Sequence, residues 1–415
     1  MTRPERGSGR VVGFALLAAL CAAGAGCEDE TTSPPAQEPF TVTWRTGEPG
    51  RASFLYGESS RLPWRIAYET ASPGSTHTVR LLGVEAGTRY QGRWRLHRAD
   101  GSVLEEAGFL FDVARDVAPA GVFHFRMIDV GWGDAHLLTT PEGVDVLIDA
   151  GRPDRAAVVV DFLRSIGIED GVRDLDGVVL THPDCDHVGG FVGSLEDPGD
   201  GVLENFTVAW ALEGEGVQDE GPFYVRFRDL LDRQGADLAE IPDGSSSVDE
   251  PCLRWDAGLA IHALNSGNQI GDGLANNGSI VLQIIAGGVT LLTGGDAQVE
   301  VERRLLDLYG ERLASHVLKV HHHGNSDASL EDFIRAVRPL VALVPIARGD
   351  VVSSMPSGEV LERLRDAGAD ILRSDRVEIL DLAGGYHVFI WTDGSSLEVG
   401  WQTSGTSHDA HPDCP

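Results

Sequence analysis

One short stretch, residues 179–190, constrains the fold of this 415-residue chain more than any other. Within it, four side chains that can bind a metal ion lie between an apolar run and a glycine pair: His182, Asp184, Asp186 and His187. Residues 176–180 have the pattern of a short buried strand that Pro183 ends, so the four side chains belong to the loop after a strand. Loops at strand ends carry the chemistry of α/β proteins. Because imidazoles and carboxylates at this spacing can converge on divalent cations, the stretch predicts a metal site, with a polar turn as the alternative.

Two further segments have the same form, an apolar run that ends in residues able to bind metal. Residues 291–296 end in Asp296, and residues 318–324 contain three consecutive histidines before a glycine. With them, the pattern resembles the metallo-β-lactamase superfamily of hydrolases, whose H-x-H-x-D-H signature corresponds to residues within 181–187. Asp184 stands where that signature usually has its second histidine. This replacement resembles the ComEC-type branch, the nuclease-like domain of competence proteins.

Other parts of the chain resemble the same branch. The matching stretches are residues 125–135, which look like its D-V-G-x-G-D-A strand, and residues 146–151, 276–282 and 355–356. Two positions depart from the branch, Trp132 in place of a glutamine and Met355 in place of a histidine. The resemblance covers the domain expected at residues 120–403 and implies an α/β fold, the metallo-β-lactamase αββα sandwich.

The resemblance also implies two divalent metal ions, zinc in the first place, with manganese or iron as alternatives. The ligands implied are His182, Asp184 and His322 for one ion, Asp186 and His187 for the other, and Asp296 as a bridge between them. Asp149, at the end of a buried strand, is expected to orient a ligand from behind. The preference for His322 over His323 rests on strand alternation, which sends its neighbours to the opposite face.

This ligand set indicates the chemistry. Two divalent ions and three ionised aspartates leave a net charge of about +1, which suits an anionic, oxygen-rich substrate. The ions would lower the pKa of a shared water for attack, with Asp186 and Asp296 as the catalytic carboxylates. Asn277 and the backbone near Gly324 are candidate donors to the substrate oxygen. We therefore expect a phosphoester hydrolase of phosphodiesterase or nuclease-like type, with an amide or lactam hydrolase, or a binding lipoprotein without turnover, as alternatives.

The chain begins with the features of an export signal over residues 1–27. Three arginines precede an apolar stretch, residues 11–26, that is too short to span a membrane comfortably. Residues 24–27 resemble a lipoprotein cleavage box, with Gly24 in place of the usual leucine. We expect a cell-envelope protein held by lipid on Cys27, with cleavage nearby and secretion as the alternative. Residues 28–39 are acidic and then rich in Thr, Ser and Pro, which predicts a flexible tether.

Residues 40–115 consist of short alternating segments separated by turns, a pattern typical of an all-β sandwich. Residues 84–90 resemble the fibronectin type III corner, in which a tyrosine, here Tyr90, bonds back to the preceding loop. A link containing Pro119 separates this domain from the next, so we expect it to fold alone and to serve in spacing or docking. Residues 404–415 are expected to form a C-terminal tail.

The second domain alternates strands with amphipathic helices. The predicted helices are residues 154–166, 298–309, 330–337 and 359–367, the third with Ser329 as its N-cap. Residues 191–256 give a poor signal, and we expect loops around one helix near residues 224–231 that form a wall of the substrate cleft.

The formal net charge is −31. Such a charge repels polyanions, so we expect no extensive nucleic-acid surface, and contact with a membrane only through the lipid anchor. The sequence leaves the oligomeric state open. Lys319 is the single lysine of the chain, which we attribute to base composition of the genome. Cys252 is expected to pair with Cys414, because a bridge at Cys185 would distort the loop between two ligands, although Cys185 as a thiolate ligand is the alternative.

Overall fold

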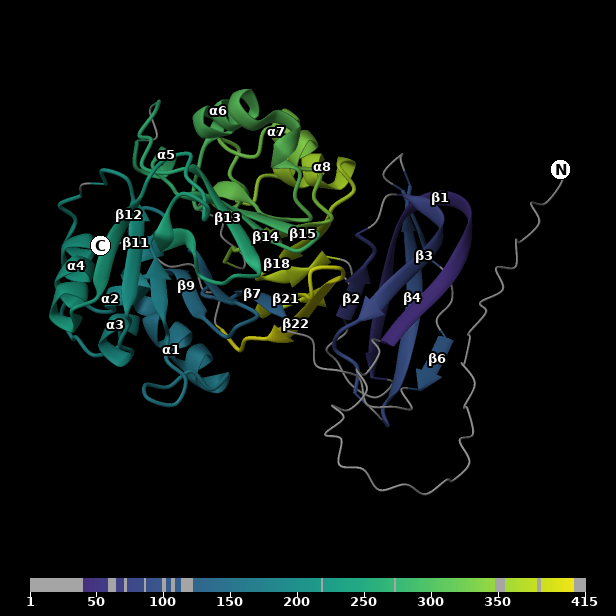
Figure 1. The fold of residues 1–415 in the computed structure, drawn as a ribbon, viewed down its shortest axis with the longest axis horizontal. Helices are drawn as coiled ribbons and strands as arrows, with labels where there is room; N and C mark the ends of the chain where they lie inside the picture. The colour runs from purple at the N-terminus through teal and green to yellow at the C-terminus, as the bar shows by residue number, and fades with distance from the viewer. Residues whose placement is uncertain are drawn as a thin grey trace, which may run out of the picture.

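The computed structural model describes residues 40–58, 65–70, 73–85, 87–98, 102–105, 109–112, 122–217, 219–271, 274–347, 355–378 and 382–406. The expected signal peptide, tether and interdomain link lie outside the described residues, as does most of the expected C-terminal tail. Within these ranges the chain forms two β-sheets with helices on their outer faces, and a strand-rich N-terminal module beside them (Figure 1). The predicted α/β fold is confirmed.

The first sheet has the order β12-β11-β10-β9-β8-β7-β21-β22 and then continues into the N-terminal module. Its strands are β7 (Phe123–Met127), β8 (Ala135–Thr139), β9 (Asp145–Ala150), β10 (Gly177–Val179), β11 (Trp210–Gly214), β12 (Asp237–Ile241), β21 (Tyr386–Thr392) and β22 (Leu397–Thr403). The helices associated with it are α1 (Ala156–Ser165), α2 (Cys185–Val192), α3 (Val202–Asn205) and α4 (Pro222–Gln234). Because β9 to β12 pair in parallel, their carboxyl ends share one edge, where open α/β sheets bind ligands.

The second sheet has the order β13-β14-β15-β16-β17-β18-β19-β20. Its strands are β13 (Leu259–Asn265), β14 (Val281–Ala286), β15 (Val289–Thr293), β16 (Val317–Lys319), β17 (Val341–Val344), β18 (Asp370–Arg373), β19 (Arg376–Val377) and β20 (Leu382–Ala383). The helices on this side are α5 (Leu274–Asn277), α6 (Val299–Tyr309), α7 (Glu331–Val337) and α8 (Gly358–Asp366). The strands β15 to β18 are parallel, so this sheet also brings several carboxyl ends to one edge.

Three apolar layers hold the domain together. One lies between the two sheets and includes Phe125, Ile148 and Ile261. The other two lie between each sheet and its own helices, around Phe191 on the first side and Phe333 on the second. Each such side chain, once fully buried, contributes about 1.5–3 kcal/mol, so the strands are fixed most firmly at their centres and the chemistry is left to their ends.

The N-terminal module is a strand-rich unit with its own aromatic core. It contains β1 (Phe40–Glu58), β2 (Arg65–Tyr68), β3 (Gly74–Leu81), β4 (Arg89–His97), β5 (Val103–Glu105) and β6 (Phe109–Asp112). The expected corner is present, because the backbone N–H of Glu85 donates to the Tyr90 hydroxyl at 2.9 Å. Strand β2 pairs antiparallel with β22, from Arg65 opposite Gly400 to Tyr68 opposite Leu397. The module therefore continues the first sheet, and its independent folding stays a prediction.

Two local expectations were wrong. The segment predicted to be loops around one helix contains that helix, α4, but also α3, β11 and β12, and its two strands extend the first sheet in parallel. Helix α7 begins after Leu330 rather than Ser329 as its N-cap. The carboxylate of Glu302, on α6, accepts from the backbone N–H of Ser329 at 2.8 Å and of Leu330 at 2.7 Å, so a side chain distant in the sequence holds the two residues that precede the helix. In the described ranges, no helix combines the length and apolar character needed to cross a membrane.

Candidate metal centre

The predicted ligand segments meet where strands of both sheets end. The loop after β10 and the first turn of α2 come from the first sheet and carry the residues from His182 to His187. The loop after β15 carries Asp296, and the turn η4 (His321–Gly324) after β16 carries the three histidines. Because each of these segments follows a strand whose centre is buried, the fold holds their ends in place.

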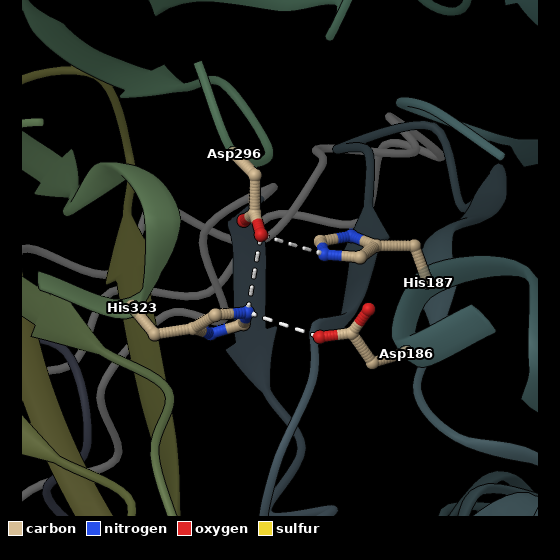
Figure 2. Close-up of side chains that lie close together, drawn as sticks. All are labelled: Asp186, His187, Asp296 and His323. Carbon is tan, nitrogen blue, oxygen red and sulfur yellow. Dashed lines mark ion pairs between the residues drawn. The ribbon is translucent and has the colours of Figure 1, made fainter. Parts of the chain in front are cut away.

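Four of these side chains form a compact cluster: Asp186, His187, Asp296 and His323. One ligand atom from each lies within 4.8 Å of the others. Oδ2 of Asp296 lies 3.4 Å from Nε2 of His187 and 3.5 Å from Nε2 of His323. Nε2 of His323 also lies 3.5 Å from Oδ2 of Asp186, and Figure 2 shows the four side chains pointing toward one another.

Asp149 supports this cluster from behind, as expected. Its Oδ2 lies 2.8 Å from Nδ1 of His187, which leaves Nε2 of that ring directed at Asp296. Thr181 holds the same carboxylate, through its backbone N–H at 2.8 Å and its hydroxyl at 2.6 Å. Asp134, Asp149 and His187 also lie close enough to hold an ion. That group forms the hydrogen-bonded support instead, because Asp149 already engages Nδ1 of the ring and Asp134 pairs with Lys319.

Both His322 and His323 face Asp296. The alternation argument, which sends His323 to the opposite face, is wrong because β16 ends at Lys319 and a turn follows. In that turn His322 has φ 47° and His323 has φ 52°, both in the left-handed region. Nε2 of His322 lies 3.8 Å from Oδ2 of Asp296, and its Nδ1 lies 2.8 Å from Asp327. The structure thus adds His323 to the cluster and leaves His322 beside it.

His182 and Asp184 lie at the outer side of the cluster. Nε2 of His182 lies 3.5 Å from Oδ2 of Asp184, and its ring centroid lies 4.0 Å from that of His187. The Asp184 side chain is 44% exposed, whereas His182 is buried. The open side of the centre is therefore at Asp184, and its role as a ligand stays a prediction.

Several polar atoms of the cluster have no hydrogen-bond partner among the described residues. They are Nε2 of His182, His187 and His323, and Oδ1 of Asp296. Buried polar atoms are rarely left unpaired, because each unpaired one costs about 1–3 kcal/mol. Imidazole nitrogens and carboxylate oxygens that converge without partners fit one or two divalent ions such as zinc, manganese or iron.

The charges of the cluster act strongly on one another. Burial alone would lower the pKa of His323, but the nearby carboxylates of Asp296 and Asp186 raise it to about 10. Burial alone would raise the pKa of Asp296, but His323, His187 and His322 hold it well below its usual range. Without an ion, the site therefore balances its carboxylates with protonated imidazoles. A divalent cation would take the place of those protons.

Asn277, the predicted donor to substrate, is committed to the protein. Its Nδ2 donates to the carbonyl of Ile270 at 2.6 Å, and its Oδ1 accepts from the backbone N–H of Gln298 at 3.0 Å. The neighbouring Asn276 instead places Nδ2 3.5 Å from Nε2 of His322. Asn276 is therefore the better candidate donor.

Sequence reasoning missed two residues that contact the cluster. The indole N–H of Trp132 donates to Oδ2 of Asp186 at 2.9 Å, and its ring centroid lies 5.4 Å from that of His323. Lys319 is fully buried and forms an ion pair with Asp134. The signal was available for both, since Trp132 and Asp134 lie in the stretch that resembles the opening strand of the branch, and the single lysine lies two residues before the first of three consecutive histidines.

The expected cysteine pairing was wrong. Cys185 is disulfide-bonded, to a partner that lies outside the described residues. Cys252 is the free cysteine in the described part of the chain. A bridge at Cys185 does not distort the ligands, because Cys185 is the first residue of α2 and its neighbours Asp184 and Asp186 still face the site. It also excludes the alternative that Cys185 is a thiolate ligand.

Comparison with known protein families identifies the family of this chain. The sequence model described as "Metallo-beta-lactamase superfamily" matches residues 129–348, more than half of the chain. The chain belongs to the metallo-β-lactamase superfamily. Members are generally hydrolases, and the matched residues include every member of the four-residue cluster.

The chain is also similar to curated competence proteins. It is 28% identical over 275 residues to competence protein ComA of Neisseria gonorrhoeae, covering 66% of this chain and 34% of that protein. It is 26% identical over 267 residues to ComE operon protein 3 of Bacillus subtilis (strain 168), covering 60% and 31%. The chain thus spans about a third of the length of these relatives. The expected resemblance to the ComEC-type branch is confirmed.

The solved structures that the chain matches are more distant. CmlA, a diiron beta-hydroxylase from Streptomyces venezuelae, is 11% identical with a TM-score of 0.37, covering 78% of this chain and 74% of that chain. A metallo-beta-lactamase from Cronobacter sakazakii is 14% identical with a TM-score of 0.31, covering 57% and 85%.

Proposed function

We propose that this chain is an exported, metal-dependent hydrolase of the metallo-β-lactamase superfamily that cleaves a phosphoester. The observation that carries the proposal is the convergence of imidazole nitrogens and carboxylate oxygens that lack hydrogen-bond partners in the described part of the chain. The ligand set is rich in carboxylates, which supports the phosphoester over a lactam. The similarity to competence proteins and the signal-like residues 1–27 support a phosphodiester and a lipoprotein of the cell envelope, respectively.

The residues of the chain would hold and orient two divalent ions. Bound there, the ions would supply an activated water and a Lewis acid for the substrate oxygens. Asp149 fixes the ring of His187, Asp327 fixes that of His322, and the indole of Trp132 holds Asp186. On the two histidines these contacts leave Nε2 directed at Asp296, which reduces the reorganisation needed when substrate binds.

Substrate would approach from the side of Asp184. The side chains of Asp184 and Asp327 are 44% and 42% exposed, whereas Asp134, Asp149 and Lys319 close the other side. On the open side, the Nδ2 group of Asn276 can donate to a non-bridging oxygen. Acidic side chains at this opening favour a small substrate whose charge is met by the ions rather than by a basic protein surface.

The proposal is tested by assaying the purified protein, loaded in turn with zinc, manganese and iron, on a phosphodiester, a phosphomonoester and a β-lactam. We expect the phosphodiester to be hydrolysed. Asp296→Asn should lower the rate by at least about a hundredfold, because it removes the carboxylate that faces His187, His322 and His323. The matched control is Asp332→Asn, on α7, whose side chain is 79% exposed, and which should leave the rate unchanged.

The alternatives give different results in the same assay. Preferential turnover of the β-lactam would assign the chain to amide chemistry on the same fold. A protein that holds stoichiometric metal but hydrolyses no phosphoester above the metal-free control would be a binding protein. Either result would overturn the phosphoesterase proposal while leaving the fold unchanged.

A further inference from the structure

The single lysine of the chain lies directly behind the metal centre. Lys319 is the last residue of β16 and is fully buried. Its ammonium group forms an ion pair with Oδ2 of Asp134 and donates to the carbonyl of Gly295 at 2.8 Å. It also lies 3.8 Å from Oδ1 of Asp296, a member of the cluster.

Stability does not explain this buried pair. Moving two charges out of water costs several kcal/mol for each ion, and well-packed apolar residues of similar volume are often as stable or more stable. The preceding positions on β16, Val317 and Leu318, are buried and apolar, and they show what this strand needs for packing alone. The charged pair at Lys319 and Asp134 therefore calls for a role in the neighbouring site.

The pair connects the two sheets. Asp134 lies between β7 and β8 of the first sheet, whereas Lys319 ends β16 and Asp296 follows β15 of the second. On the first side, the backbone N–H of Asp134 donates to the carbonyl of Asp186 at 3.1 Å. Its carboxylate lies 3.5 Å from Nδ1 of His323 and 4.0 Å from Nδ1 of His187. Every member of the cluster therefore touches either Lys319 or its partner.

We infer that Lys319 is a positioning residue that fixes the separation between the ligands of the first sheet and those of the second. Its ammonium draws Asp134 and the segment Gly295–Asp296 toward one point, and these carry or contact the ligands of both sheets. The apolar layer between the sheets sets their distance only coarsely, because side chains there can repack, whereas a charge with three oxygen neighbours defines a position. The inference rests on the proposed metal centre but is independent of the substrate.

Metal affinity tests this inference without any assay of turnover. Asp134→Asn and the double variant Asp134→Asn with Lys319→Met are titrated with zinc against a chromophoric chelator. The double variant contains no unpaired buried charge at this position, so it should fold. We expect the double variant to bind zinc about tenfold to a hundredfold more weakly than Asp134→Asn alone, because it lacks the Lys319 ammonium as well as the Asp134 carboxylate. Equal zinc affinity of the two variants would overturn the inference.

A matched control separates position from general loss of a buried pair. Arg95→Met with Asp370→Asn removes another buried pair, which joins β4 to β18 away from the site. This double variant should bind zinc as the wild type does. If its affinity falls as far as that of the variant lacking Lys319, the effect is one of global stability and the inference fails.

The single lysine also gives a direct signal. Protein labelled with ¹³C at lysine Cε has one side-chain resonance, that of Lys319. Titration of the full chain with zinc should shift this resonance, since Asp296 must turn part of its charge from the ammonium to the ion. A structural pair with no role at the site predicts a resonance that does not move. Loss of hydrolysis with the shift intact would count against the proposed substrate, not against Lys319.

Discussion

Left-handed backbone conformations occur where the metal centre needs them. His322, His323 and Asp149 all have positive φ, at 47°, 52° and 55°. Each such residue costs on the order of 1–3 kcal/mol and persists only where its surroundings enforce it. Here the conformation of the two histidines turns both rings toward Asp296, and that of Asp149 accompanies its contact with His187. Among the described residues, three of the five non-glycine residues with positive φ therefore hold or orient ligands, and the other two are Ser329 and Arg338.

A histidine away from the site gives a prediction on pH. Burial lowers the pKa of His387 to about 4, although Asp129 raises it slightly, and its Nδ1 accepts from the backbone N–H of Asp129 at 3.0 Å. A lowered pKa stabilises the fold above the unfolded-state value of about 6.5, and this contribution is lost as pH falls toward about 4. Between pH 7.5 and pH 5, the wild type should lose about 2 kcal/mol more than His387→Gln, which keeps an acceptor but does not titrate.

The measurement is urea denaturation of the metal-free protein at both pH values. Removing metal keeps the ligand histidines from dominating the result. His262→Gln, on β13, is the control for replacing a histidine by glutamine at another position. Parallel loss of stability in the wild type and His387→Gln would show that His387 is protonated in the fold without cost.

Among the elements, α2 matters most because its first turn carries Asp186 and His187. Two glycines in its second turn let it pack directly on the first sheet. A Cβ atom at Gly190 would lie 1.8 Å from the carbonyl oxygen of Ala150, at the end of β9, and one at Gly189 would lie 2.4 Å from Pro153. The backbone N–H of Gly190 donates to the carbonyl of Gly151 at 2.7 Å. The glycine pair thus sets how deeply the ligand-bearing turn enters the site.

Gly190→Ala should therefore act on both stability and metal. The added methyl group cannot fit against backbone, so α2 must move away from β9. We expect a loss of about 1–3 kcal/mol in the free energy of unfolding and at least about a tenfold weaker affinity for zinc. Urea denaturation and chelator competition measure the two effects.

The control for that variant is Gly358→Ala, in the first turn of α8. No atom lies within 4 Å of a Cβ built there, and its φ is not positive. It should change the free energy of unfolding by no more than about 1 kcal/mol, in the stabilising direction. A Gly190→Ala protein as stable as this control would mean that the helix does not rest on β9 as the structure has it.

At the scale of the whole molecule, the N-terminal module contacts the metal domain through buried side chains as well as through the pairing of β2 with β22. Arg95 forms a two-pronged contact with Asp370 of β18, at 2.8 Å and 3.1 Å, and the Tyr68 hydroxyl donates to the same carboxylate at 2.8 Å. The Tyr56 hydroxyl donates to Glu398 of β22 at 2.7 Å. Buried, paired charges between two units resist separation, since each would be left unpaired. The contacts therefore predict joint unfolding, whereas the alternation of residues 40–115 predicts independent folding.

Denaturation of the full chain distinguishes these two expectations. We expect a single transition, with the same midpoint by circular dichroism and by tryptophan fluorescence. Asp370→Asn should lower the free energy of unfolding of the full chain by about 3–5 kcal/mol, because Arg95 would lose its charged partner inside the protein. Glu331→Gln breaks an exposed pair with Arg335 and should change it by less than about 1 kcal/mol. An early transition confined to one module would favour independent folding.

The sequence by itself determined the features that depend on neighbouring positions. Helical spacing of apolar residues located α1, α6, α7 and α8 within a few residues, because each helix must bury one face. The stretch from His182 to His187 identified the metal chemistry, since local spacing already brings those side chains together. The same stretch, with Asp296, was sufficient for the superfamily. The prediction failed for the segment that contains β11 and β12, because short strands flanked by glycine show no clear periodicity of apolar residues.

The tertiary structure alone decided what depends on segments far apart in the chain. The choice of Asn276 over Asn277 follows from which amide the loop at Ile270 already occupies. His323 faces the cluster because the turn after β16 has a left-handed conformation, which contacts with the surrounding structure impose. In the sequence, Lys319 is explained by composition alone. In the structure it pairs with Asp134, which lies 185 positions earlier and belongs to the other sheet. The role of a buried charge depends on the group that it pairs with. Folding selects that group, and the order of residues in the sequence does not.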